Sequence, residues 1–312
     1  MIQSATLDTA SAATRCCEAC GSSRVNRRYS FDGFQLLACT SCDMLWIPDP
    51  PVDIRGLYSA EYYAGRRNYY FGNSITDPAQ RRENANIRDF QRGLDLLERE
   101  RPPARSKLLD VGCAIGVFLS LARDRGWQAR GIDISSYATE YARRTFQVDA
   151  VCGELATAGI PDGEFDVITL WDVFEHFPDP ARQLREMHRI LKDDGLVLLD
   201  TPNSLSLLRR LAHLLYRASL GRLTYPAQKL HHVFHLYYYS RESLRRMVER
   251  YGFEVVWMRG KTIPLVKARG NRLERSIVGT LAVFERTLGM EYELLTLLRK
   301  KPDLRFDAAA RA

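Results

Sequence analysis

The sequence predicts an α/β protein built around a parallel, doubly wound sheet. Between residues 106 and 260, short apolar segments of strand character alternate with segments of helical periodicity. Helices that follow successive strands are the usual crossovers of a parallel sheet. Residues 108–135 give the clearest example, because strand, glycine-containing turn, helix and second strand follow one another directly. The 312 residues leave room for one such domain and a smaller one beside it.

The turn after the first strand, with the acids around it, indicates a site for a nucleoside-containing cofactor. Gly112 and Gly116 permit close approach of the backbone to a ligand. Asp133 ends the next strand about twenty residues later, where a carboxylate can bind a ribose. Asp110 precedes the turn, and a carboxylate there repels a pyrophosphate but suits the ammonium group of S-adenosylmethionine. The pattern therefore favours S-adenosylmethionine over a dinucleotide.

Five segments in order resemble the motifs of class I S-adenosylmethionine-dependent methyltransferases. They are LLDVGCAIG, GIDIS, FDVITLWDVFEHFPDP, LKDDGLVLLDTPN and HLYYYSRESLRRMVERYGF, within residues 108–256. The resemblance implies a Rossmann-like sheet and methyl transfer. One departure is Ala114, where the family usually has Gly; its methyl group should be tolerated, with at most a slight shift of the methionine end of the cofactor. The residues expected at the cofactor are Asp110, Gly112, Cys113, Ala114, Gly116, Asp133, Ile134, Glu154 (near the adenine), Trp171 and Asp172.

Four cysteines ahead of the sheet have the spacing of a zinc ribbon. Two Cys-x-x-Cys pairs are separated by 18 residues, so that four thiolates can complete a tetrahedral shell. The segment between the pairs predicts two short strands with a turn at residues 32–33, and Cys16 is the spare cysteine. Iron in a rubredoxin-like site and unliganded thiols are the alternatives. With few apolar residues, the module is expected to need its metal in order to fold. The expected ligands are Cys17, Cys20, Cys39 and Cys42.

Residues 48–105 are expected to link this ribbon to the large domain. A proline-rich break at 48–51 marks the boundary, and a stretch with many tyrosines and two arginines follows it. Such aromatics either stack nucleic-acid bases or pack the linker against the catalytic domain with their hydroxyls in the cleft; we favour packing. Residues 77–101 have helical spacing and should cover the cofactor cleft.

Two histidines are candidate bases for the reaction. His176 follows the strand at 165–170, at the edge where such sheets bind ligands. His235 lies in a segment that resembles zinc-ribbon sugar methyltransferases, in which a histidine at this place acts as the base. Where the carbon-methylating members have Glu just before it, this chain has Phe234, which argues against methylation of a keto-sugar carbon. A metal site and a histidine bonded to a backbone carbonyl are the alternatives. We expect His235 to be the first base and His176 the second.

Positive charge is concentrated in two segments. Residues 204–230, within an insertion at 204–232, hold five Lys/Arg and no acid. Their helical pattern predicts a leucine face (207, 208, 211, 214 and 215) opposite arginines 209, 210 and 217. We favour a lid over the active site, with contact to an anionic membrane surface as the alternative.

The rest of the chain predicts a helix at 240–251 that begins at Ser240, then a strand at 253–258 that completes the sheet. Beyond it, residues 261–312 are expected to form a basic helical tail, with one long helix from residue 273 to 301. Its role is dimerisation, membrane contact through 270–305, or a cap over the substrate cleft.

The composition and the apolar pattern predict the cellular compartment of the protein. No apolar run reaches the ~18–20 residues that span a bilayer. Residues 1–15 lack a hydrophobic core and are expected to be a flexible tail rather than a secretory signal. Seven cysteines without an export signal indicate reduced thiols in the cytoplasm, with peripheral contact at the inner membrane face as a further expectation.

The expected acceptor is an anionic small molecule, most specifically a hydroxyl of a sugar, nucleotide-sugar or glycolipid. RNA methylation, with the ribbon docking the RNA, is the main alternative. The strand end LWDVFEH lacks an Asn-Pro-Pro-Tyr type of motif and places acids where a phosphate chain would pass, which argues against it. Carbon methylation of a keto-sugar and a non-catalytic cofactor-binding partner are further alternatives. The chain is expected to divide into a tail (1–15), the ribbon (16–47), a linker with a helical cover (48–105), the methyltransferase domain (106–260) and a basic helical tail (261–312). A homo-oligomer is a further expectation.

Overall fold

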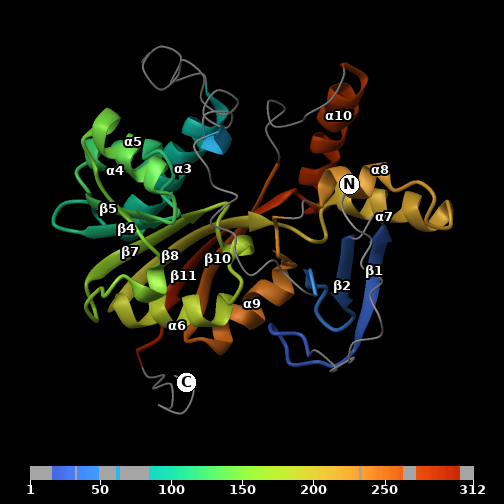
Figure 1. Cartoon of the computed structure of the whole chain (residues 1–312), viewed down its shortest axis with the longest axis horizontal. Coiled ribbons are helices and arrows are strands. Elements are labelled where there is room, and N and C mark those ends of the chain that lie inside the picture. Colours follow the sequence, from blue (N-terminus) through green and yellow to red (C-terminus); the bar gives the residue numbers. More distant parts are fainter. Residues whose placement is uncertain are drawn as a thin grey trace.

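A seven-stranded sheet with helices on both faces forms the body of the protein (Figure 1). The computed structural model describes residues 16–31, 34–48, 61–63, 84–231, 234–262 and 272–302. The strand order is β10-β11-β8-β7-β4-β5-β6, and the pairs from β8 to β6 are parallel. This confirms the predicted α/β, doubly wound sheet. The strands are β4 (Lys107–Val111), β5 (Gln128–Asp133), β6 (Asp149–Cys152), β7 (Phe165–Trp171), β8 (Leu191–Pro202), β10 (Phe253–Lys261) and β11 (Glu293–Lys300).

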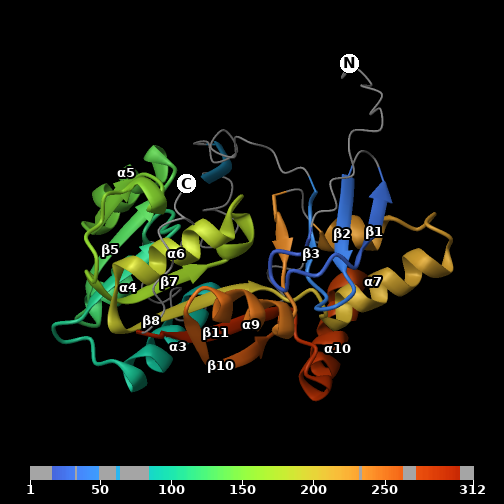
Figure 2. The ribbon, with the colours of Figure 1, turned by 90° about the horizontal axis from the view of Figure 1, so that it is seen from below.

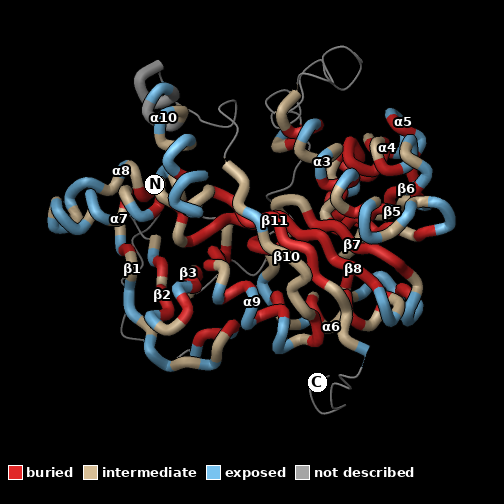
Figure 3. The backbone as a smooth tube through the Cα atoms, turned by 180° about the vertical axis from the view of Figure 1, so that it is seen from behind, coloured by how far each residue is buried: buried red, intermediate tan, exposed pale blue. Residues whose placement is uncertain are grey.

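Successive side chains of the inner strands point to opposite faces of the sheet and pack against different layers of helices. Val167 of β7 packs with Leu94 and Phe118 on one face, whereas Ile168 packs with Leu184 and Met247 on the other. The inner strands are buried along most of their length (Figure 3). Such two-sided burial explains why they are nearly continuous apolar runs. The first layer contains α3 (Ala85–Glu100) and α4 (Val117–Asp124), beside α5 (Ser136–Phe146); the second contains α6 (Pro180–Ile190) and α9 (Arg241–Arg250).

Several helices begin at polar side chains that cap free backbone N–H groups. Asn84 accepts from the N–H groups of Asn86 and Ile87, and thereby fixes the start of α3. Ser240 and Ser243 form a reciprocal capping box at α9, which confirms the helix start predicted at Ser240.

A second, four-stranded sheet stands beside one end of the large one (Figure 2). β1 (Val25–Phe31) and β2 (Phe34–Cys39) are the two strands predicted between the cysteine pairs; the turn predicted at 32–33 lies outside the described residues. β3 (Leu45–Trp46) follows them, and β9 (Tyr237–Tyr238) pairs with β3 from far along the chain. The ribbon sheet is therefore completed by a strand of the large domain.

The C-terminal part differs from its prediction. The predicted single helix is α10 (Arg272–Leu288), which ends before Gly289, and the residues that follow form β11. β11 runs antiparallel between β8 and β10, with Leu294, Leu297 and Leu298 fully buried. The prediction of a helix up to residue 301 was wrong, because pairing with two neighbouring strands overrides the helical spacing of these leucines. The strand at 253–261 accordingly lies at the edge of the sheet.

The insertion also differs in which side chains face inward. It forms α7 (Leu207–Ala218) and α8 (Tyr225–Leu230). Arg209, predicted on the exposed basic face, is only 2% exposed, whereas Leu214 of the predicted leucine face is 61% exposed. Arg209 is buried because it donates hydrogen bonds to the carbonyls of Asn203 (3.0 Å) and Tyr292 (3.1 Å) and lies over the Tyr292 ring. No helix within the described part of the chain is long and apolar enough to cross a membrane.

Candidate active site

The turn between β4 and α4 needs glycine at two positions for its own geometry. Gly112 and Gly116 have φ values of +72° and +81°, in the region that side chains disfavour. A Cβ on Gly112 would lie 2.4 Å from Val173 Cγ2, and one on Gly116 would lie 2.6 Å from Ala142 Cβ. The sequence attributed the two glycines to room for a ligand. On this side of the turn, close packing of protein atoms also requires them. The contact with Val173 also fixes the turn against the segment that follows β7.

Asp133, at the end of β5, binds three separate parts of the chain. Its Oδ2 accepts the N–H of Ala114 at 2.9 Å, and its Oδ1 accepts the N–H of Ser135 at 2.8 Å. The hydroxyl of Tyr63 donates to Oδ1 at 3.3 Å. Burial raises the pKa of Asp133, and the two backbone donors and the tyrosine oppose that rise. The predicted ribose acid thus also organises the glycine turn.

Ala114 occupies the strained position of that turn. Its φ is +47°, in the left-handed region that is unfavourable for a residue with a Cβ. Its hydrogen bond to Asp133 helps to hold this conformation. The departure from glycine noted in the sequence thus coincides with a left-handed residue in the turn.

Asp110, at the end of β4, is a buried acid with one strong partner. It is 2% exposed, and Thr169 of β7 donates its hydroxyl to Oδ1 at 2.7 Å. Burial raises the pKa of Asp110 to about 8, with the charge of Asp133 adding to the rise. Without a ligand this carboxyl is therefore mainly protonated at neutral pH, and a nearby cation would favour its ionised form. Thr169 was missed from the sequence; the signal was a hydroxyl in the otherwise aliphatic strand FDVITLW.

Three further predicted cofactor residues lie around this turn. Cys113 is buried, and a Cβ on Gly131 of β5 would lie 2.6 Å from its Sγ. Ile134 follows Asp133 directly and is half-buried. Glu154 precedes the short helix η3 (Leu155–Thr157), next to Gly153, whose N–H donates to the Asp133 carbonyl at 2.9 Å. These positions agree with a cofactor that extends from β4 past β5 to β6.

Trp171, also predicted at the cofactor, packs against two aromatic rings. Its ring lies 5.0 Å from Phe90 and 5.3 Å from Phe118, and a Cβ on Gly93 of α3 would lie 2.4 Å from it. The structure thus places this ring in the apolar layer beneath α3, because aromatic neighbours there bury it.

Asp172, the predicted cofactor residue that directly follows β7, belongs to a group of acids around one lysine. It has a φ of +53°, and its carboxylate lies within 4.8 Å of those of Asp200 and Glu293. The ammonium of Lys261 contacts Asp200 and lies 2.7 Å from Glu293. Although burial lowers the pKa of Lys261, these carboxylates raise it well above its usual range. Lys261, also missed from the sequence, therefore carries the positive charge that makes this buried group possible.

The two predicted bases lie together with a buried acid just beyond β7. Glu175 and His176 belong to the short helix η4 (Phe174–His176), and the His235 ring stands perpendicular to that of His176 with centroids 4.7 Å apart. Ligand atoms of all three side chains lie within 4.8 Å of one another. Glu175 is fully buried, and its Oε2 accepts the Thr201 hydroxyl at 3.0 Å.

The hydrogen bonds of this group define the state of His176. Its Nδ1 lies 2.6 Å from the carbonyl oxygen of Phe234, which can only accept, so Nδ1 carries a hydrogen. Its Nε2 lies 4.0 Å from Glu175 Oε1. Burial raises the pKa of Glu175 well above its usual range. In the neutral ring, Nε2 is therefore the nitrogen that can accept a proton.

The four predicted ligand cysteines converge on one point. The Sγ atoms of Cys17 and Cys42 are 3.5 Å apart, those of Cys20 and Cys39 are 3.6 Å apart, and all four lie within 4.8 Å of one another. A tetrahedral shell with Zn–S bonds near 2.3 Å separates sulfurs by about 3.8 Å. A hydrogen bond from Cys42 lowers the pKa of Cys17 to about 5. The donor set and spacing fit a structural zinc ion, and Cys16 is exposed.

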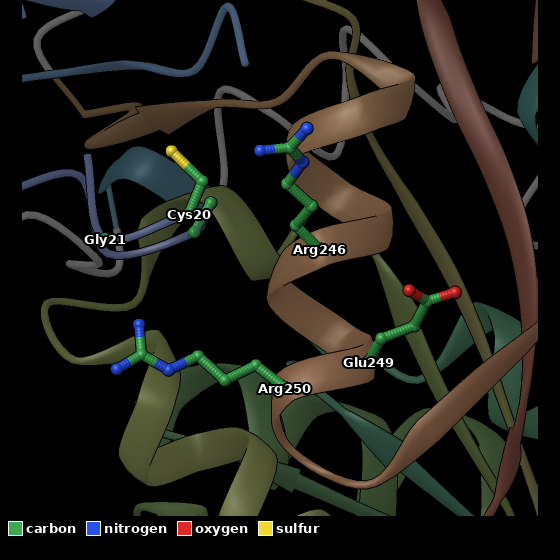
Figure 4. A pocket seen from close by; sticks show the side chains of 6 residues that line it. Cys20, Gly21, Arg246, Glu249 and Arg250 are labelled. Carbon is green, nitrogen blue, oxygen red and sulfur yellow. The ribbon is translucent and has the colours of Figure 1, made fainter. Parts of the chain in front are cut away.

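A hollow of about 500 Å³ separates the first cysteine pair from α9. Figure 4 shows that Arg246 and Arg250 extend from α9 toward Cys20 and Gly21. Arg250 donates to the Glu18 carbonyl at 3.2 Å and so ties the ribbon to the large domain. The two guanidinium groups place positive charge beside a thiolate shell that would be net negative with zinc bound.

Comparison with known proteins identifies the family of the large domain. Residues 80–257, more than half of the chain, match the model of a methyltransferase domain family. The chain belongs to this family. Residues 80–257 thus form a domain of the S-adenosylmethionine-dependent methyltransferase kind, and the acids and the glycine turn described above lie within it.

The curated relatives cover a smaller region. The ubiquinone biosynthesis O-methyltransferase of Thiobacillus denitrificans is 34% identical over 117 residues, which are 35% of this chain and 50% of that protein. The enzyme of the same name from Pseudomonas aeruginosa is 34% identical over 108 residues, 32% of this chain and 46% of its own length. The methyltransferase thus spans about half the length of these relatives.

Solved structures support the fold. A putative sarcosine dimethylglycine methyltransferase from Galdieria sulphuraria superposes with a TM-score of 0.53 at 14% identity, covering 77% of this chain and 98% of that one. A putative methyltransferase structure in complex with its Trm112 activator from Haloferax volcanii has a TM-score of 0.50 at 17% identity, with coverage of 73% and 97%. At these identities the likeness concerns the fold alone.

Proposed function

We propose that this methyltransferase methylates a hydroxyl group of a small molecule, most specifically of a sugar, nucleotide-sugar or glycolipid. The observation that carries the proposal is the group of Glu175, His176 and His235, whose ligand atoms lie within 4.8 Å of one another. Two of its members belong to η4, which directly follows Val173, the residue packed against Gly112 of the glycine turn. Curated relatives named O-methyltransferases support oxygen as the acceptor atom.

The residues around the turn suit the three parts of the cofactor, which supplies an activated methyl group. Asp110 in its ionised form would hold the ammonium group, and Asp133 the ribose hydroxyls. Glu154 lies beyond β6, where it would hydrogen-bond the adenine. Because the methyl group is already activated, the protein mainly has to align the acceptor and remove its proton.

The histidine pair would remove that proton. An imidazole nitrogen would take the hydroxyl proton of the acceptor, while the acceptor oxygen would receive the methyl group that the cofactor supplies from its sulfur. His235 is the proposed base because its ring packs against His176 beside Glu175, and His176 is the second candidate. The buried Glu175 would hold the orientation of the pair.

The acceptor class can be tested with radiolabelled methyl groups. Purified enzyme and methyl-labelled S-adenosylmethionine are incubated with cell extract, which is then separated into RNA, lipid and small-molecule fractions. Label in the small-molecule or lipid fraction, on oxygen after hydrolysis, supports the proposal. Label in RNA, or on carbon, would replace it with one of the alternatives.

The role of His235 has a separate test. His235→Gln should lower turnover by about a hundredfold or more, as expected for loss of a general base, with cofactor affinity unchanged. His188→Gln is the matched control. His188 lies on α6, where its ring bonds the Lys301 carbonyl, and it takes no part in the proposed reaction. Unchanged turnover in His235→Gln would remove this residue from the mechanism.

We also propose that the four converging cysteines bind one structural zinc ion. The spacing of their sulfurs and the burial of Cys17, Cys39 and Cys42 support this ligand set. A redox-inactive metal with four thiolates has no open position for catalysis, so its function would be to hold the ribbon.

A further inference from the structure

Nine exposed side chains, five of them apolar and four basic, lie on α7, α8 and their connection and are here called the basic–apolar patch. Its most exposed apolar residue, Leu220, is 85% exposed, and the other four lie between 42% and 61%. Such a density of exposed leucine is unusual for a surface that faces only water. The patch consists of Leu214, Leu215, Leu220, Leu223 and Tyr225 together with Arg210, Arg217, Arg222 and Lys229.

The packing of α7 explains why these side chains face outward. The opposite side of the helix is fixed to the ribbon sheet, where Tyr29 contacts the rings of His213 (5.5 Å) and Tyr216 (5.1 Å) edge-on. Ala212 of the same helix is also buried, and Arg209 is held by the carbonyls of Asn203 and Tyr292. The leucines of the outer side therefore cannot turn inward without breaking this interface.

The charge of the patch selects its partner. Residues 204–230 contain five Lys/Arg and no acid. The pKa of the nearby His213 is lowered to about 4, mainly by burial, and the positive charges of Arg28 and Arg217 add to this lowering. A symmetric dimer through this patch would oppose two sets of like charges without a neutralising acid from this segment. An anionic lipid surface can bury the leucines and at the same time pair with the arginines.

We propose that the basic–apolar patch docks the enzyme on the surface of a bilayer that contains anionic lipids. The leucines would enter the interface between headgroups and acyl chains, while the arginines and the lysine contact lipid phosphates. Docking is peripheral, since no described helix is long and apolar enough to span a membrane. α7, α8 and α10 lie at the end of the molecule opposite α4 and α5 (Figure 1), so that the two ends provide a test and a control.

Co-sedimentation of the full chain with vesicles tests this inference. Vesicles of phosphatidylcholine alone are compared with vesicles that contain about one third phosphatidylglycerol. We expect binding to the anionic vesicles only, weakened at high salt because the attraction is screened. Arg217→Glu/Arg222→Glu should weaken binding at least about twentyfold, since each cation near such a surface contributes about fivefold. Leu220→Ser/Leu223→Ser should weaken it about tenfold or more at unchanged charge.

A charge reversal at the other end of the molecule is the matched control. Arg130→Glu/Arg144→Glu changes the net charge equally on β5 and α5, where both arginines are exposed. This variant should bind within about threefold of the unchanged enzyme. Circular dichroism and cofactor binding confirm that all variants are folded, and neither readout depends on vesicles.

Three outcomes overturn the proposal. They are equal binding to neutral vesicles, equal loss in the control variant, and absence of binding to either kind of vesicle. A dimer in solution that the Leu220→Ser/Leu223→Ser variant converts to a monomer, without vesicle binding, would assign the patch to self-association instead. None of these results depends on the identity of the methyl acceptor.

Discussion

The hydroxyl of Tyr63 lies 3.3 Å from Oδ1 of Asp133, although the two residues are 70 positions apart in the chain. Tyr63 belongs to the tyrosine-rich linker, and it is buried against the large domain. Of the two roles considered for that linker, this contact supports packing, with a hydroxyl directed at Asp133, the acid proposed to bind the cofactor. The N-terminal segment therefore reaches the proposed cofactor site.

Tyr63→Phe should weaken cofactor binding about fivefold and lower the free energy of unfolding by about 1 kcal/mol. One hydrogen bond to a buried carboxylate is lost, while both backbone donors to Asp133 remain. Calorimetric titration with S-adenosylhomocysteine and denaturant unfolding measure the two effects. Tyr137→Phe, whose ring lies 6.5 Å from that of Tyr63, should change neither. Equal effects in both variants would contradict a specific role for the Tyr63 hydroxyl.

Cofactor binding should release a proton from Asp110. The pKa of this carboxyl is raised to about 8 in the free protein by burial, and the cationic ammonium group would favour its ionised form. Below pH 8, affinity should therefore rise with pH, by up to tenfold per unit. Titration calorimetry at pH 6 to 7.5 in buffers of different ionisation enthalpy measures the protons released. Asp110→Asn should bind more weakly and release none.

Asp110 also makes the free energy of unfolding depend on pH in the absence of cofactor. Because the folded pKa of Asp110 lies above the unfolded value of about 4, the folded state holds the proton more tightly. This contribution is complete below pH 4 and is lost as the pH rises toward 8. Comparing the pH dependence of unfolding for the wild type and Asp110→Asn isolates it; a contribution that grows with pH would contradict the raised pKa.

Ala114→Gly should stabilise the protein by about 0.5–1 kcal/mol. Ala114 has a φ of +47°, where a Cβ is unfavourable, and glycine removes that strain at some cost in chain entropy. Gly112→Ala should have the opposite sign and a larger effect, because its Cβ would meet Val173 at 2.4 Å. Thermal unfolding of both variants is the measurement, and a loss of stability in Ala114→Gly would show that the turn prefers alanine.

Cys42→Ser should abolish stoichiometric zinc binding and destabilise the ribbon. Cys42 is one of four thiols within 4.8 Å of one another, and three ligands do not close a structural shell. Elemental analysis of purified protein should give about one zinc per chain. Cys16→Ser, which changes the exposed neighbouring cysteine, should retain the metal. Iron in place of zinc would support the rubredoxin-like alternative, and an absence of metal would reject the site.

Arg209→Ala should destabilise the protein by about 3 kcal/mol or more. The change removes a charged donor from the carbonyls of Asn203 and Tyr292, each of which keeps one backbone donor, and it removes the ring contact with Tyr292. It also leaves the space of a fully buried side chain empty. Arg217→Ala, on the exposed side of the same helix, should stay within about 0.5 kcal/mol. Similar values for the two variants in denaturant unfolding would contradict the burial of Arg209.

The part of the fold predicted from sequence is the part with a distinctive local pattern. β4 to β8 are apolar runs closed by polar residues, and the two cysteine pairs have a metal-site spacing. β11 has no such signature, because Leu294, Leu297 and Leu298 also fit helical spacing. Only pairing with β8 and β10 decides between helix and strand for those residues.

The two histidines proposed as general bases also show how far the sequence alone can predict the site. Each histidine is visible as a candidate in its own segment, but their meeting depends on long-range backbone contacts. Leu236 donates its N–H to the Glu175 carbonyl at 2.9 Å, and the Phe234 carbonyl bonds His176. Arg209 is a similar case, since a helical wheel separates polar from apolar residues and does not show which arginine has buried acceptors.

The pairing of β3 with β9 has a consequence for the order of synthesis. β9 is the last of the four strands to be made, so the small sheet is complete only after the ribosome has delivered the parallel strands and the insertion that follows them. A cut at the linker would separate the first three strands from the strand that pairs with β3.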